Sequence, residues 1–191
     1  MKTTRVEAFS DGVFAVIITI MVLELKVPHG ADWQALRAVV PALLTYVLSF
    51  IFIGIYWNNH HHMLHITTQV NGAIMWANLH LLFWLSLLPF VTAWMGENHF
   101  EPLPTAVYGG VLLLAAIAYT TLQYAIIRDQ GPHSKLAQAV RYDVKGKLSL
   151  VLLVSAIPLA FVHQAISDVI YAIIAAIWLV PDRRIESRVH E

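Results

Sequence analysis

Cysteine is absent from this 191-residue sequence. The protein can therefore form no disulfide, no thiolate metal site and no cysteine nucleophile. Charge is also scarce, because only 13% of the residues are Asp, Glu, Lys or Arg, and the 12 basic residues balance the 12 acidic ones. A chain without a global basic field is a poor ligand for nucleic acid, so we expect no nucleic-acid partner.

Common catalytic signatures are missing too. The sequence contains no G-x-S-x-G nucleophile turn, no H-E-x-x-H zinc motif and no G-x-x-x-x-G-K-[ST] phosphate loop. Each of these patterns places reactive groups at the spacing that its chemistry requires. We therefore predict that the protein is not an enzyme.

Apolar residues are abundant. They make up 58% of the chain, and the mean hydropathy is +0.65, values typical of a polytopic membrane protein. A spanning helix needs about 20 mostly apolar residues. The sequence thus predicts an all-α, single six-helix subunit over residues 1–191, embedded in the lipid bilayer. Its spans are expected at about 4–25, 34–60, 71–95, 104–127, 147–162 and 166–180, the last two as a tight antiparallel hairpin.

The basic residues indicate the orientation of the chain. If the N-terminus is cytoplasmic, ten of the 12 Lys and Arg residues lie on the cytoplasmic side, and Lys26 and Arg37 remain outside. An excess of Lys and Arg in cytoplasmic loops is the usual determinant of topology. We therefore expect both termini to be cytoplasmic.

The first predicted span begins with an unusually polar stretch that contains Arg5, Phe9, Ser10 and Asp11. Polar groups at membrane depth are costly unless they face protein or water. Suitable partners lie at the same predicted depth, and paired polar groups form strong networks in a low-dielectric interior. The predicted partners, at the end of the second span and in the third, are Trp57, His60, His61 and Asn78.

The same helix has a second, apolar side. At about 100° per residue, Ile20 and Leu23 lie within about 40° of Val16, and Thr19 lies at the edge of this stripe. Asp11 lies about 140° away from Val16 around the helix. This separation predicts that the acidic residue contacts neighbouring helices, whereas the stripe has a different role.

Short side chains suggest where helices approach one another. Ala106 with Gly110, and Ala172 with Ala176, have the small-xxx-small spacing that lets membrane helices pack closely. We expect helix contacts at these two pairs.

Two other functions are compatible with the polar residues. His61 and His65 stand at i and i+4, a spacing that can place two imidazoles on one metal or haem iron. Alternatively, Asp11 and the histidines could relay protons in a proton-coupled membrane carrier. No further ligand set accompanies the histidines in the sequence, and we expect no metal or other cofactor.

The polar stretch also carries a family resemblance. Arg5 followed by Phe9-Ser10-Asp11-Gly12-Val13-Phe14-Ala15, together with Trp57-x-x-His60-His61, resembles the transmembrane protein 175 family of endolysosomal potassium channels. Eukaryotic members have two six-helix repeats. A single repeat is similar to the prokaryotic form, which implies a homotetrameric potassium channel of a prokaryotic inner (cytoplasmic) membrane.

The resemblance also implies roles for individual residues. In this family the first helix lines the pore, and the Phe-Ser-Asp segment holds helices together. The implied constriction falls on Val16, Ile20 and Leu23, and the threonine linked to potassium preference falls on Thr19. Val16 stands where a longer Ile or Leu is common, which implies a wider ring there. The T-V-G-Y-G filter of other potassium channels is absent from the family and from this sequence.

Overall fold

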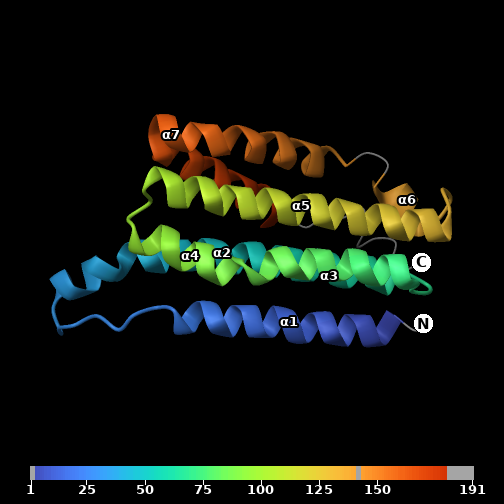
Figure 1. Cartoon of the computed structure of the whole chain (residues 1–191), viewed down its shortest axis with the longest axis horizontal. Helices are drawn as coiled ribbons and strands as arrows, with labels where there is room; N and C mark the ends of the chain where they lie inside the picture. The colour runs from blue at the N-terminus through green and yellow to red at the C-terminus, as the bar shows by residue number, and fades with distance from the viewer. Residues whose placement is uncertain (1–2, 141–142, 180–191) are drawn as a thin grey trace.

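The protein is a bundle of long helices that run roughly side by side (Figure 1). The computed structural model describes residues 3–140 and 143–179, and these ranges contain no β-strand. The predicted all-α fold is therefore confirmed. The helices in chain order are α1 (Thr3–Leu23), α2 (Trp33–His65), α3 (Gly72–Ser86), α4 (Leu88–Glu97), α5 (Pro102–Gln130), α6 (Lys135–Val140) and α7 (Val144–Leu179).

The last helix, α7, folds back on itself at His163, where φ of −161° and ψ of 107° interrupt the helical backbone. Two hydrogen bonds join its arms. Ser167 Oγ donates to the Ala156 carbonyl at 2.7 Å, and Trp178 Nε1 donates to Ser149 Oγ at 2.9 Å. The arms are therefore antiparallel, as expected for a hairpin. Among the described residues, five helical segments are long and apolar enough to cross a membrane, and the longest of them is the two-armed α7.

The segment predicted as the third span is divided at Leu87 into α3 and α4. Pro89 lies in the first turn of α4, where its ring removes a backbone N–H that would otherwise continue the helical hydrogen bonds. Residues 72–97 remain one apolar segment of 26 residues. The interruption therefore produces one span made of two consecutive helices.

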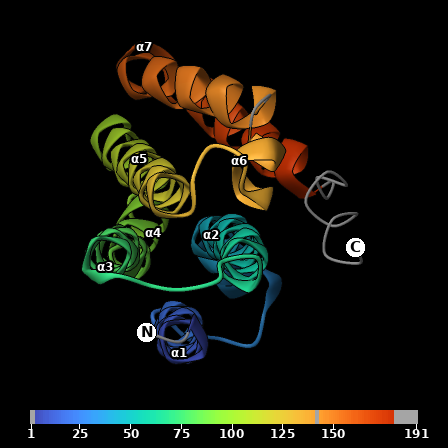
Figure 2. The same ribbon diagram turned by 90° about the vertical axis from the view of Figure 1, so that its right-hand side faces the viewer.

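Helix α5 packs between α3 and α4 on one side and α7 on the other (Figure 2). Its residues Ala115, Ala118 and Leu122 are completely buried. Helix α1 lies at the edge and packs against α2, α3 and α4. One side of α1 is therefore left without a covering helix from its own chain.

Two elements differ from the predicted spans. Helix α2 continues to His65 instead of ending near His60, because Met63 and Leu64 in the extra turn are buried in the core. The connection after α5 contains the short helix α6, in which Leu136 is buried. A single anchoring leucine is too weak a pattern to predict such a helix from sequence.

The close helix approach involves a different glycine from the one expected. A Cβ atom added at Gly110 would meet no described atom within 4 Å, whereas one added at Gly109 would lie 2.8 Å from Tyr171 Cζ. Tyr171 is fully buried and donates from its hydroxyl to the Thr105 carbonyl at 3.1 Å. Ala172 and Ala176 are exposed. The tight contact of α5 with α7 therefore depends on Gly109.

This contact predicts unequal effects of the same substitution at adjacent glycines. Gly109→Ala should destabilise the protein by about 1–3 kcal/mol, the usual cost of overpacking, because the hydrogen-bonded Tyr171 ring cannot move aside freely. Gly110→Ala is the matched control, since both changes add the same helix propensity. Thermal unfolding in lipid nanodiscs, followed by tryptophan fluorescence, should show a lower melting temperature for Gly109→Ala. Equal melting temperatures would contradict the packing argument.

Candidate functional site

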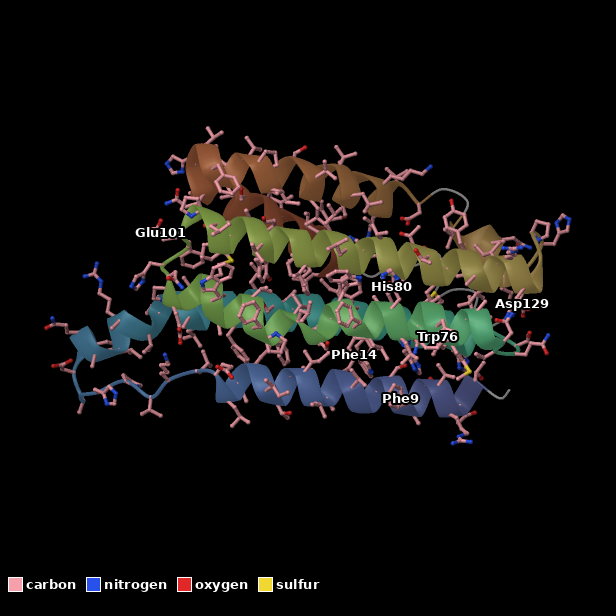
Figure 3. The ribbon with its side chains drawn as sticks, viewed as in Figure 1. Phe9, Phe14, Trp76, His80, Glu101 and Asp129 are labelled. Carbon is pink, nitrogen blue, oxygen red and sulfur yellow. The ribbon has the colours of Figure 1, made fainter. Side chains whose placement is uncertain are left out.

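Helix α1 has one side buried in the bundle and one side exposed. The buried residues recur every three or four positions, and they are Val6, Ser10, Phe14, Ile17 and Met21. In Figure 3, Phe14 points from α1 towards the neighbouring helices. A period of three to four residues places these side chains on one side of the helix. This side attaches α1 to the rest of the subunit.

A chain of buried polar groups crosses from α1 through α3 to α2. Ser10 Oγ donates to the Val6 carbonyl at 2.8 Å and accepts a hydrogen bond from Asn78 Nδ2 at 3.0 Å. The Asn78 amide oxygen lies 2.7 Å from His60 Nε2. Because an amide oxygen can only accept, His60 Nε2 carries the proton. Three helices are thus joined by side chains that are almost completely inaccessible to solvent.

Two further polar contacts join α1 to α2 nearer the surface. Trp57 Nε1 donates to Asp11 Oδ1 at 2.9 Å, and His61 Nδ1 lies 2.9 Å from Glu7 Oε1. Trp57 and His61 were both predicted as partners of the polar stretch. The structure pairs Asp11 with the Trp57 indole and Glu7 with the His61 imidazole. Glu7 was missed, although its i, i+4 spacing to Asp11 places both carboxylates on one side of the helix.

Arg5 and Phe9 do not join this network. Both are exposed, and together with Met75 and Leu79 they line a groove between α1 and α3. No hydrogen bond or ion pair connects Arg5 to another described residue. Of the eight residues predicted for the network, the structure therefore brings together Ser10, Asp11, Trp57, His60, His61 and Asn78.

The apolar stripe lies on the exposed side of α1. Val16, Ile20 and Leu23 have exposed fractions of 54%, 42% and 80% in the single subunit. Thr19 is exposed too, and its hydroxyl donates to the Val16 carbonyl at 2.8 Å within the same helix. The stripe is therefore not part of the core of its own subunit. It is available to lipid or to another copy of the chain.

The histidines do not form a metal site in the described part of the chain. The rings of His61 and His65 are stacked with centroids 6.0 Å apart. No group of three or more His, Asp or Glu side chains among the described residues is arranged to hold a metal ion. The i, i+4 pair therefore lacks the additional ligands that a stable metal centre needs.

Comparison with known proteins gives the family. The family model described as "Endosomal/lysosomal potassium channel TMEM175" matches residues 5–89, the part that carries the stripe and the whole polar network. A potassium channel of Chryseobacterium sp. (strain P1-3) is 51% identical over 191 residues, which is 100% of both chains. The chain belongs to the TMEM175 family.

Other TMEM175 relatives agree with this assignment. A potassium channel of Streptomyces collinus is 38% identical over 135 residues, or 66% of each chain. The crystal structure of a lysosomal potassium-selective channel TMEM175 homolog from Chamaesiphon minutus has a TM-score of 0.80 and 28% sequence identity to this chain. The match covers 93% of this chain and 96% of that one. The TMEM175 fold thus extends over almost the whole protein.

The buried polar chain predicts a specific loss of stability. Ser10→Ala removes the acceptor of Asn78 Nδ2 at a site that water cannot reach, so it should cost about 1–2 kcal/mol of unfolding free energy. Ser86→Ala is the matched control, because Ser86 is exposed and donates to the Phe83 carbonyl of its own helix. Equilibrium unfolding in mixed micelles would measure the change in unfolding free energy of each variant. A loss no larger than that of the control would show that the contact contributes nothing.

Proposed function

We propose that four copies of this chain form a potassium-selective, leak-type cation channel. The observation that carries the proposal is the two-sided α1, whose inner side is held by the polar network while Val16, Ile20 and Leu23 remain uncovered. The relatives named as potassium channels support potassium as the permeant ion. Around a fourfold axis, the uncovered sides of α1 would face one another and line a central pore.

The proposed membrane orientation has both termini in the cytoplasm of a bacterial cell, with the chain in the inner membrane. The start of α1, the end of α5 and helix α6 lie at the same end of the bundle (Figure 1). Arg128, Lys135 and Lys145 belong to this end, so the basic residues gather as cytoplasmic residues do. At the opposite end, Lys26 Nζ lies 2.5 Å from Glu97 Oε1.

The constriction would consist of rings of aliphatic side chains. Four copies each of Val16, Ile20 and Leu23 would produce successive apolar rings, and such rings gate channels by excluding water. The Thr19 hydroxyl, held by the Val16 carbonyl, would add a polar ring between them. The buried network serves this pore by setting the rotation of α1, because Ser10 and Asp11 fix the side that faces the bundle.

Potassium flux tests the proposal directly. Protein reconstituted in liposomes should release potassium down its gradient, and Ile20→Ala or Leu23→Ala should raise the flux or relax selectivity, because a shorter side chain widens a ring. Leu114→Ala on the exposed side of α5 is the matched control and should leave the flux unchanged. No ion flux under any gradient would disprove the channel.

The network predicts an effect on assembly. Asp11→Ala removes the acceptor of the Trp57 indole, so α1 should lose its fixed rotation and the tetramer should dissociate or aggregate. Asp32→Ala is a suitable control, since it removes an exposed carboxylate that caps α2 and lies away from the network. Light scattering in detergent measures the mass. Normal tetramers of Asp11→Ala with changed ion selectivity would contradict the anchoring role.

A proton-coupled carrier is the second candidate, and the pairing of Glu7 with His61 is the observation in its favour. The hydrogen bond that Asp11 accepts, however, comes from the Trp57 indole, a group that does not titrate and so cannot pass a proton along the relay. Asp11→Asn separates the two functions because it retains an acceptor oxygen and removes the titratable group. If the protein is a carrier, its transport should saturate with substrate, and the Asp11→Asn variant should lose coupled transport. If it is a channel, the folded Asp11→Asn variant should still conduct potassium.

A further inference from the structure

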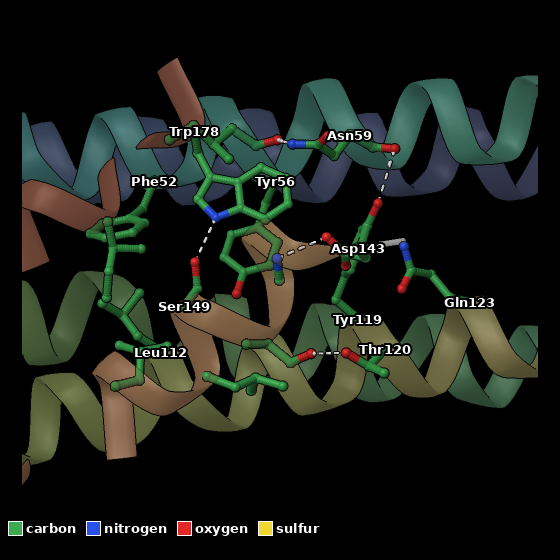
Figure 4. Close-up of a pocket in the computed structure, with 16 residues that line it drawn as sticks. Phe52, Tyr56, Asn59, Leu112, Tyr119, Thr120, Gln123, Asp143, Ser149 and Trp178 are labelled. Atoms are coloured by element: carbon green, nitrogen blue, oxygen red, sulfur yellow. Dashed lines mark hydrogen bonds between the residues drawn. The ribbon is translucent and has the colours of Figure 1, made fainter. Parts of the chain in front are cut away.

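A cavity of about 70 Å³ lies on the other side of the bundle from α1, between α2, α5 and the two arms of α7 (Figure 4). This is several times the space that one water molecule needs, and the cavity is only partly enclosed, so a ligand longer than the cavity can extend out of it. None of its lining residues comes from α1. The cavity is therefore separate from both the polar network and the proposed pore.

The cavity changes in character from one end to the other. Phe52 and Leu112 line one end in Figure 4, whereas Tyr119, Gln123 and Asp143 line the other. Leu153 and Ile174 add to its apolar lining. A ligand that fills this space must therefore be amphipathic, with a short apolar part and a polar or charged head.

The polar end has an acidic group. Asp143 Oδ1 accepts a hydrogen bond from the Gly146 N–H at 2.8 Å. Lys145 and Lys147 follow in the first turn of α7, but neither of them lines the cavity. The carboxylate thus gives the head-group end a preference for positive charge.

Aromatic rings surround the middle of the cavity. Tyr56 and Tyr119, which leads on to the polar end, are in edge contact with ring centroids 6.0 Å apart, and Trp178 lies beside Tyr56 (Figure 4). The Trp178 indole N–H is already used by Ser149. Aromatic rings attract cations electrostatically, and a quaternary ammonium ion is well suited to them because it needs no hydrogen-bond acceptor.

We propose that this cavity binds an organic ammonium ion with a short alkyl chain. The alkyl chain would lie against Phe52 and Leu112, and the ammonium head would lie between the aromatic rings and Asp143. A bare metal ion is a poor fit, since Asp143 is the one carboxylate among the described lining residues and hard cations in proteins are usually held by several charged or carbonyl oxygens. An anionic amphiphile would place its charge against the Asp143 carboxylate. The proposal does not depend on ion conduction.

The test compares a cation with its uncharged analogue. Butyltrimethylammonium and the isostere in which carbon replaces nitrogen, 2,2-dimethylhexane, would be titrated against the full-length protein in nanodiscs. Tryptophan fluorescence would report binding. The cation should bind saturably and at least about fivefold more tightly than the isostere, in keeping with desolvated cation–π contacts.

Variants then locate the site. Asp143→Asn should abolish most of the preference for the cation while retaining the helix cap, because Asn caps as well as Asp. Tyr56→Leu should weaken cation binding about threefold to tenfold. Asp129→Asn, at a carboxylate on the same end of the bundle that bonds Asn71 instead, is the control and should have no effect.

Three outcomes would overturn the proposal. Absence of saturable binding to the folded protein would exclude the site. Equal affinity for the cation and the isostere would identify an apolar crevice that a lipid chain can occupy. Cation binding that survives both Asp143→Asn and Tyr56→Leu would place the ligand elsewhere, including in the pore. Potassium flux of the same samples, measured separately, distinguishes failure of this proposal from failure of the channel.

Discussion

A polar group inside a membrane-spanning helix must find its hydrogen-bond partner within the protein, because lipid supplies none. The start of α1 meets this constraint through neighbouring helices. Ser10 reaches Asn78 and, through it, His60, while Asp11 and Glu7 reach Trp57 and His61. These contacts require one rotation of α1 about its axis. The position of every other side chain on that helix follows from this rotation.

The exposed stripe is the direct consequence. Since α1 packs at the edge of the bundle, the side opposite Ser10 and Phe14 has no cover from the same chain. Val16, Ile20 and Leu23 occupy that side. The network and the stripe are therefore two results of a single packing arrangement, and this is why polar residues several turns away bear on the geometry of a proposed constriction.

The two long sides of the subunit differ in the residues that form them. The α1 side presents aliphatic residues on a single helix, a surface suited to identical neighbours. The α5 and α7 side encloses a cavity whose walls include aromatic rings and one carboxylate. The proposed permeation surface and the proposed ligand site thus share no residue, because α2 lies between them. Its Tyr56 faces the cavity, whereas its Trp57 contacts α1.

Much of the architecture was predictable because hydropathy is a local property of the chain. The runs of about 20 mostly apolar residues indicated where the long helices lie, and the short link around His163 correctly indicated the hairpin. The break at Leu87 and the extra turn of α2 were not expected, since a proline within a span and a buried turn at its end leave little trace in hydropathy. The choice of Gly109 over Gly110 as the close contact depends on Tyr171, which is distant in sequence.

The candidate site, too, was predictable in part from the sequence and in part only from the tertiary structure. The sequence by itself determined that α1 has a polar side and an apolar side, because residues separated by 3.6-residue turns must share a face. Only the tertiary structure decided the partners: Asp11 contacts Trp57, Glu7 contacts His61 and Ser10 contacts Asn78. Several imidazole, indole and carboxamide groups lie at similar depth, and which of them comes within hydrogen-bond distance depends on how three separate helices pack.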